Sequence, residues 1–94
     1  MVSRTGEQYG DRFPLGGGTT NIGRHPNSDI VLDDITVSRR HAQVVYQDGA
    51  FFVRDVGSLN GTYVNQQRTE ETRLYHGDEV QVGKFRLVFF DRTE

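Results

Sequence analysis

The sequence predicts an all-β fold, an antiparallel β-sandwich built from many short strands. Three observations predict this class. Several short runs of the 94-residue chain alternate apolar and polar side chains, as a strand does when one of its faces is buried. Turn signals that contain glycine separate these runs. No segment of useful length has the periodicity of an amphipathic helix.

Two adjacent runs predict a β-hairpin near the middle of the chain. In AQVVYQ, residues 42–47, every second residue from Ala42 onward shares one face. FFVRDV, residues 51–56, alternates in the same way. Asp48 and Gly49 lie between the two runs, and this dipeptide is typical of a two-residue type I′ turn.

A second hairpin is predicted near the end of the chain. DEVQV, residues 78–82, and FRLVFF, residues 85–90, both alternate. Gly83 and Lys84 separate them, with glycine in the first position as a type II′ turn requires. We expect residues 85, 87 and 89 to point in one direction.

The beginning of the chain predicts a first strand that is incomplete. Residues 2–4, Val-Ser-Arg, resemble the tail of a first strand, and glycines 16–18 provide a flexible connection between two early strands. The length favours a single domain over residues 1–94. Because the chain also stops within a few residues of the last predicted strand, we expect a domain excised from a longer protein.

Composition excludes several classes of function. The chain has 11 Lys and Arg against 13 Asp and Glu, and a formal net charge of −2, so bulk attraction to nucleic acid or to an anionic membrane is not expected. It has no cysteine, which excludes disulfides, thiolate metal sites and a cysteine nucleophile.

Targeting and metal-binding patterns are also missing from the sequence. No apolar run approaches the roughly 20 residues of a membrane helix, and the first fifteen residues lack the apolar core of a signal peptide. His25, His41 and His76 are too scattered to form a metal site. We therefore expect a cytoplasmic monomer that needs no metal and no cofactor.

Polar residues and glycines gather in three places, each beside a predicted strand end. These are GRH at 23–25, SRRH at 38–41 and GSLNGT at 57–62. Loops at one end of a sandwich converge in space even when they are distant in sequence. The three segments together predict a pocket that contains guanidinium groups, a hydroxyl and an amide.

This set of groups fits a phosphorylated side chain. Arginine presents a planar fork of donors that matches phosphate or carboxylate oxygens, and serine and backbone N–H groups add neutral donors. An asparagine amide both donates and accepts, so it can hold a peptide backbone. A phosphorylated residue brings a charge of about −1.5 to −2 and three acceptor oxygens.

Three segments resemble, in this order, the forkhead-associated (FHA) domain: GRHPNSDI, VSRRHAQ and GSLNGTYVN. The family pattern of Gly-Arg, Ser-x-x-His and Asn-Gly falls at residues 23–24, 38–41 and 60–61. GDEVQVGKFRLVFF resembles the closing strands of the family, so the likeness extends to Phe90. Each motif alone is weak, but three in order are specific.

The style of DDITVSRRHA and DVGSLNGTYVN resembles small actinobacterial FHA regulators of 2-oxoglutarate metabolism. The resemblance implies a non-enzymatic module in Ser/Thr kinase signalling that binds phosphothreonine in a protein or peptide, with an autophosphorylated Ser/Thr kinase as one possible partner. It also implies a small apolar niche for the threonine methyl group.

The resemblance assigns five residues to the phosphothreonine and its peptide. Arg24 would hold the phosphate, Ser38 would donate its hydroxyl, and Arg39 would supply a second charge. Asn60 would hold the main chain of the peptide. Leu59 stands where the family often has a hydroxyl, so only its backbone N–H could reach the phosphate. The alternatives are a solvated surface arginine, a turn serine and an Asn-Gly type I′ turn.

Four residues would support the pocket: Gly23, His41, Gly61 and Thr62. The resemblance implies that His41 hydrogen-bonds to loop backbone and keeps the shape of the pocket. Adjacent residues in an extended chain face opposite ways, so Arg39 is preferred for the phosphate and the role of Arg40 stays open.

Two other functions remain open at this stage. The polar loops could bind and regulate a partner enzyme independently of phosphate. Ser38 and His41 could also belong to a hydrolase, but the chain has no GxSxG motif and no acid that would orient the histidine. We therefore expect no catalytic residue.

Overall fold

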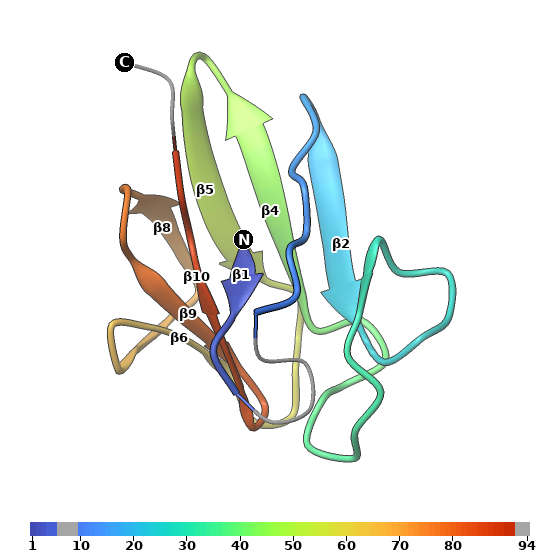
Figure 1. The fold of residues 1–94 in the computed structure, drawn as a ribbon. Helices are drawn as coiled ribbons and strands as arrows, with labels where there is room; N and C mark the ends of the chain where they lie inside the picture. The colour runs from blue at the N-terminus through green and yellow to red at the C-terminus, as the bar shows by residue number, and fades with distance from the viewer. Residues whose placement is uncertain (6–9, 92–94) are drawn as a thin grey trace.

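The computed structural model describes residues 1–5 and 10–91, and these form two five-stranded sheets packed face to face (Figure 1). One sheet has the order β1-β10-β9-β6-β7 and the other β3-β2-β4-β5-β8. The described residues contain no helix, so the predicted all-β sandwich is confirmed. The strands are β1 (Val2–Ser3), β2 (Thr19–Gly23), β3 (Ile30–Val31), β4 (Ala42–Gln47), β5 (Ala50–Asp55), β6 (Thr62–Val64), β7 (Gln67–Thr69), β8 (Glu71–Leu74), β9 (Glu79–Val82) and β10 (Phe85–Val88).

The hairpin of β4 and β5 has the predicted two-residue turn. Gln47 pairs with Ala50, and Asp48 and Gly49 between them have φ angles of 53° and 80°. Two consecutive positive φ angles define a type I′ turn, whose twist matches that of the flanking strands.

The hairpin of β9 and β10 also matches its prediction. Val82 pairs with Phe85, and of the two turn residues only Gly83 has a positive φ, of 59°. This is the pattern of a type II′ turn. The apolar residues of both strands alternate inward, and β1 pairs with β10 through Val2 and Val88.

Four strands were not predicted from the sequence: β3, β6, β7 and β8. β3 has two residues and pairs parallel to β2, which makes it the one parallel pair in the described part of the chain. β6 and β7 form a third two-residue hairpin through Asn65 and Gln66, whose φ angles are 49° and 69°. This turn lacks glycine, so it carries no strong sequence signal.

The core lies between the two sheets and is apolar. Val53, Val80 and Leu87 have no exposed surface, and Phe89 is 1% exposed just beyond the end of β10. Tyr46 extends past the edge of this core and packs on Phe51, with a ring-centroid distance of 4.8 Å. Burial of this apolar face fixes the register of the strands and therefore the positions of the loops between them.

Candidate functional site

Three connections meet at the end of the sandwich where β2 and β5 finish. They join β2 to β3, β3 to β4, and β5 to β6, and Figure 1 shows them together at the lower end of the molecule. The three polar segments that the sequence singles out, at 23–25, 38–41 and 57–62, lie in these connections, apart from Gly23 at the end of β2 and Thr62 at the start of β6. Hydrogen bonds between the connections show how closely they approach each other.

Gly23 allows two of these connections to touch. A Cβ atom added at Gly23 would lie 2.0 Å from the carbonyl oxygen of Arg39, so no other residue fits without moving the backbone. Beside this contact, the Arg24 N–H donates to the Ser38 carbonyl at 3.1 Å, and the His25 N–H donates to the Arg39 carbonyl at 3.2 Å. The end of β2 is therefore joined directly to the Ser-x-x-His segment.

One nitrogen of the Arg24 guanidinium is hydrogen-bonded to the backbone, and the other two are available to a ligand. Its Nε donates to the Val37 carbonyl at 3.0 Å, while the residue as a whole is exposed. The two terminal nitrogens have no hydrogen-bond partner among residues 1–5 and 10–91. Arg24 and Arg39 line one depression together with Pro26, Val31 and Asp33.

Arg40 faces a different place from its neighbour. It lines a second depression, which includes Asn21 and Gln43 on the outer face of β2 and β4. His25 lines both depressions and lies between them.

Ser38 and Leu59 meet although 21 residues separate them in the chain. The Leu59 N–H donates to the Ser38 Oγ at 3.0 Å, so the hydroxyl proton of Ser38 remains free to donate elsewhere. The Leu59 side chain is 86% exposed and contributes nothing to the core. A hydroxyl and a backbone N–H thus lie side by side at the mouth of the site.

Asn60 is held by one end of its amide. Its Nδ2 donates to the Thr36 carbonyl at 3.1 Å, which leaves Oδ1 without a hydrogen-bond partner in the described residues. The next residue, Gly61, has a φ of 85°, whereas Asn60 does not have a positive φ. The alternative of an Asn-Gly type I′ turn is therefore wrong, because that turn needs positive φ at both residues.

His41 is fully buried and connects two of the loops. Its Nδ1 accepts the Ser38 N–H at 3.1 Å, so the proton of the neutral ring is on Nε2, which donates to the Gly61 carbonyl at 2.8 Å. Both ring nitrogens are occupied by backbone groups, and neither bonds to the Ser38 hydroxyl. His41 is therefore not placed to act as a general base for Ser38, which argues against a hydrolase built on this Ser-His pair.

Asp55, which the sequence analysis did not select, organises the loop between β5 and β6. One of its carboxylate oxygens accepts the hydroxyls of Ser58 and Thr62, and the other accepts the N–H groups of Gly57 and Ser58. Partial burial raises the pKa of Asp55, but these hydrogen bonds outweigh it and hold the pKa below the ordinary value of 3.8. An aspartate at a strand end with Gly and Ser after it is a signal for such an Asx turn.

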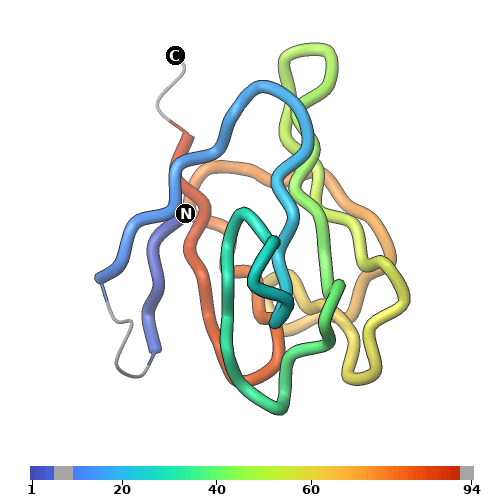
Figure 2. The backbone as a smooth tube through the Cα atoms, turned by 90° about the vertical axis from the view of Figure 1, so that its right-hand side faces the viewer, coloured from blue at the N-terminus to red at the C-terminus, as the bar shows by residue number. Residues whose placement is uncertain are grey.

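A second carboxylate, Asp34, braces the loop before β4 in a similar way. It accepts the Thr36 N–H at 2.9 Å and the Thr36 hydroxyl at 2.7 Å, and it pairs with the Lys84 Nζ at 3.0 Å. The hydrogen bonds from Thr36, together with Lys84, lower the pKa of Asp34 to about 2. Figure 2 shows this segment beside the red turn that contains Gly83, where an added Cβ would lie 2.5 Å from the Thr36 Oγ1.

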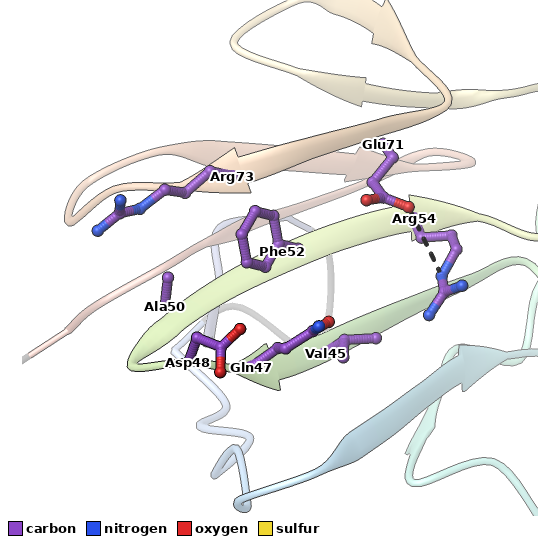
Figure 3. A pocket seen from close by; sticks show the side chains of 8 residues that line it. All are labelled: Val45, Gln47, Asp48, Ala50, Phe52, Arg54, Glu71 and Arg73. Carbon is purple, nitrogen blue, oxygen red and sulfur yellow. Dashed lines mark ion pairs between the residues drawn. The ribbon is translucent and has the colours of Figure 1, made fainter.

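Other features of the described residues do not form a competing site. The depression in Figure 3 lies on the outer face of β4, β5 and β8, away from the three loops, and its Arg54 and Glu71 pair with each other at 4.0 Å. No cluster of His, Asp and Glu in residues 1–5 and 10–91 could hold a metal ion. No helix in the described part of the chain is long and apolar enough to cross a membrane.

Comparison with protein families gives one match, to the FHA domain, over residues 20–83. The oxoglutarate dehydrogenase inhibitor of Corynebacterium diphtheriae is 59% identical over 97% of this chain. The glycogen accumulation regulator GarA of Mycolicibacterium smegmatis is 58% identical over 95% of this chain. The chain spans only 64% and 56% of the length of these two relatives.

Solved structures with this fold include one from a study of phosphothreonine-dependent FHA domain interactions. It covers 93% of this chain and 88% of its own, with a TM-score of 0.84 and 29% identity. EmbR of Mycobacterium tuberculosis, in complex with a low-affinity phosphopeptide, has a TM-score of 0.83 and 34% identity. That match covers 86% of this chain and 22% of EmbR.

Replacement of Gly23 by alanine should destabilise the protein, because the new Cβ would overlap the Arg39 carbonyl oxygen 2.0 Å away. We expect a loss of about 1–3 kcal/mol in the free energy of unfolding, measured by urea denaturation. Gly16→Ala is the matched control, since an added Cβ there has nothing within 4 Å. Equal stability of the two variants would show that the loops do not need this close approach.

Acid should destabilise the fold partly through Asp55. Its folded-state pKa lies below its ordinary value, so its carboxylate stabilises the fold above about pH 4 and this contribution is lost as the pH falls through the lower, folded-state pKa. Asp55→Asn should therefore reduce the free energy of unfolding at pH 7 and flatten its decline between about pH 5 and pH 2. Asp48→Asn, in the exposed β4–β5 turn, should keep the wild-type decline. An unchanged acid profile in Asp55→Asn would contradict the role of this carboxylate.

Proposed function

The chain belongs to the FHA domain family, and on that premise we propose that it is a non-enzymatic module that binds phosphothreonine-containing segments of other proteins. The observation that carries the proposal is the meeting of Arg24, Ser38 and the Leu59 N–H at one end of the sandwich. The likeness to a solved structure from a study of phosphothreonine-dependent FHA domain interactions, and to EmbR in complex with a phosphopeptide, supports it.

We place the phosphate in the space beside Arg24. The two free terminal nitrogens of its guanidinium can bond two phosphate oxygens, while the Nε bond to the Val37 carbonyl keeps the plane of the group fixed. Ser38 adds a hydroxyl donor beside it. Arg39 lines the same depression and adds a second positive charge. The positive charges of Arg24 and Arg39 favour a dianionic phosphate at this place, although the chain as a whole has a net charge of −2.

The Leu59 N–H has two competing acceptors in this account. It donates to the Ser38 Oγ when no ligand is bound, and a phosphate oxygen at the same place would share or replace that bond. Because the Ser38 Oγ and the Leu59 N–H are already adjacent, ligand binding requires little rearrangement of the loops. This preorganisation reduces the ordering cost of binding.

Asn60 is placed to hold the main chain of the bound peptide. Its Nδ2 is bonded to the Thr36 carbonyl, so its open Oδ1 is suited to accept a peptide N–H. Charge-assisted hydrogen bonds contribute roughly 1.5–3 kcal/mol each. Three of them, less the costs of ordering and association, fit a dissociation constant in the micromolar range, near −8 kcal/mol. A niche for the threonine methyl group would add about 0.8 kcal/mol over phosphoserine.

A second function for the same face is regulation of a partner enzyme without phosphate. The name of the relative at 59% identity, an oxoglutarate dehydrogenase inhibitor, favours it. Ile35 and Leu59 favour it as well, because their side chains are 90% and 86% exposed on loops of the site and offer an apolar contact surface. In either case we place the protein in the cytoplasm. For the phosphate-dependent function, an autophosphorylated Ser/Thr kinase is one source of phosphothreonine.

Arg24→Ala should reduce affinity for a phosphothreonine peptide at least tenfold, because one bidentate charge-assisted contact is lost. Fluorescence anisotropy with a labelled peptide from a kinase activation loop measures this directly. The melting temperature should stay close to that of the wild type, since the guanidinium is exposed.

The matched control is Arg54→Ala, which removes an equal charge from the outer face of β5. It should bind the peptide as the wild type does. Phosphatase treatment of the peptide should abolish binding to all three proteins. Affinity retained by Arg24→Ala, or by the dephosphorylated peptide, would contradict phosphate recognition and favour the phosphate-independent alternative.

A further inference from the structure

Within the described residues, β8 is an open edge of its sheet. The order β3-β2-β4-β5-β8 pairs it with β5 alone, and its residues Glu71 and Arg73 are exposed. An open edge presents backbone N–H and C=O groups that can pair with a strand of another chain. Edges are often protected by charged side chains, which repel a second strand of the same charge. β8 instead has one acid and one base, two residues apart.

The register of the sheet shows which backbone groups of β8 are unpaired. The two-residue hairpin makes Ala50 part of the closing hydrogen-bonded pair with β4, so alternate residues of β5 from Ala50 onward bond to β4 and the others bond to β8. The Asp55 N–H donates to the Glu70 carbonyl at 2.9 Å, in agreement with this alternation. Glu71 and Arg73 therefore direct their N–H and C=O groups away from β5, and these four groups have no hydrogen-bond partner among residues 1–5 and 10–91.

The open part of this edge is short and ends at residue 74. The Tyr75 N–H donates to the Asp78 Oδ2 at 2.8 Å, and the Tyr75 carbonyl accepts the Asp78 N–H at 2.9 Å. Both backbone groups of Tyr75 are thus occupied. The open segment is therefore Glu71–Leu74, and a strand that pairs with it needs to be only a few residues long.

A second copy of the same edge fits these groups. In an antiparallel pair with a two-fold axis at Thr72, Glu71 of each copy lies opposite Arg73 of the other. Both of these residue pairs are hydrogen-bonded pairs, because their backbone groups point away from β5, so the four unpaired groups of each copy all find partners. Residues directly opposite each other in antiparallel strands share a face, so each glutamate side chain also meets an arginine side chain.

The two charged side chains are available for these contacts. The Glu71 side chain is 59% exposed, and its Oε1 lies 4.0 Å from the Arg54 Nε, which is a loose ion pair (Figure 3). The Arg73 guanidinium lies 4.9 Å from the centre of the Tyr75 ring. No ion pair in the described part of the chain involves Arg73. A second copy would therefore supply the acidic partner that Arg73 lacks.

We propose that β8 is a self-association edge, at which a second copy of this chain pairs antiparallel about Thr72 and joins the two sheets into one. The inference goes beyond the proposed function, because β8 and β3, which follows the connection that contains Arg24, are opposite edges of the sheet. Two short strands and exposed ion pairs make a small interface. We therefore expect a monomer at micromolar concentration and a dimer that forms in roughly the millimolar range.

The experiment measures self-association of the ¹⁵N-labelled chain by NMR, from about 0.05 mM to about 2 mM protein. Amide chemical shifts locate the interface, and translational diffusion reports the size of the particle. Arg73→Glu and Glu71→Arg each place like charges opposite each other, whereas the double variant restores opposite charges in both pairs. Arg86→Glu is the matched control, since it makes the same charge change on β10 in the other sheet.

In the wild type, the amide signals of Glu71 and Arg73 should shift with concentration while diffusion slows toward that of a dimer. The control and the double variant should behave in the same way, and each single variant should associate about tenfold more weakly. The inference would be overturned by a wild type that remains monomeric at the highest concentration, by concentration-dependent shifts on another strand instead, or by single variants that associate as strongly as the wild type. The wild-type series decides the question even where a variant fails to fold.

Discussion

The candidate site depends on one buried side chain, the imidazole of His41. It accepts the Ser38 N–H with one nitrogen and donates with the other to the carbonyl of Gly61, 20 residues further along the chain, and so connects two loops. The side chain has no exposed surface, so both bonds form away from competing water. Without this bridge, either backbone group would lose its partner at a cost of about 1–3 kcal/mol.

The surrounding contacts extend the same arrangement outward. Gly23 lets the end of β2 press against the Arg39 carbonyl, and Asp55 gathers the hydroxyls and N–H groups of the loop before β6. The protein supplies hydrogen-bond partners to these groups, whereas the terminal nitrogens of Arg24 and the Oδ1 of Asn60 have none within the described ranges 1–5 and 10–91. The polar groups on the inner side of the loops are thus hydrogen-bonded within the protein, and those on the outer side are available to a ligand.

The sequence predicted those parts of the fold that a local pattern encodes. Alternation identified β4, β5, β9 and β10. The Asp48-Gly49 turn could be predicted because these two residue types tolerate the positive φ angles that a type I′ turn requires. The strands β3, β6 and β7 were missed because they have two or three residues, too few for alternation to stand out. β8 has four residues, but only Leu74 among them is apolar, so no alternation is visible. Asp55 was missed for another reason: an aspartate at a strand end with Gly and Ser after it signals an Asx turn, but the bond to Thr62 seven residues later depends on the folded path of the loop.

The most direct test of the account is an NMR titration of the ¹⁵N-labelled domain with a phosphothreonine peptide. The site described above predicts that the largest amide shifts fall on Ser38, Arg39, Leu59 and Asn60, and that the same peptide without phosphate shifts none of them. Largest shifts on Phe52 and Arg73, in the depression of Figure 3, would place the binding surface on the outer face of the β4–β5–β8 sheet and contradict the account.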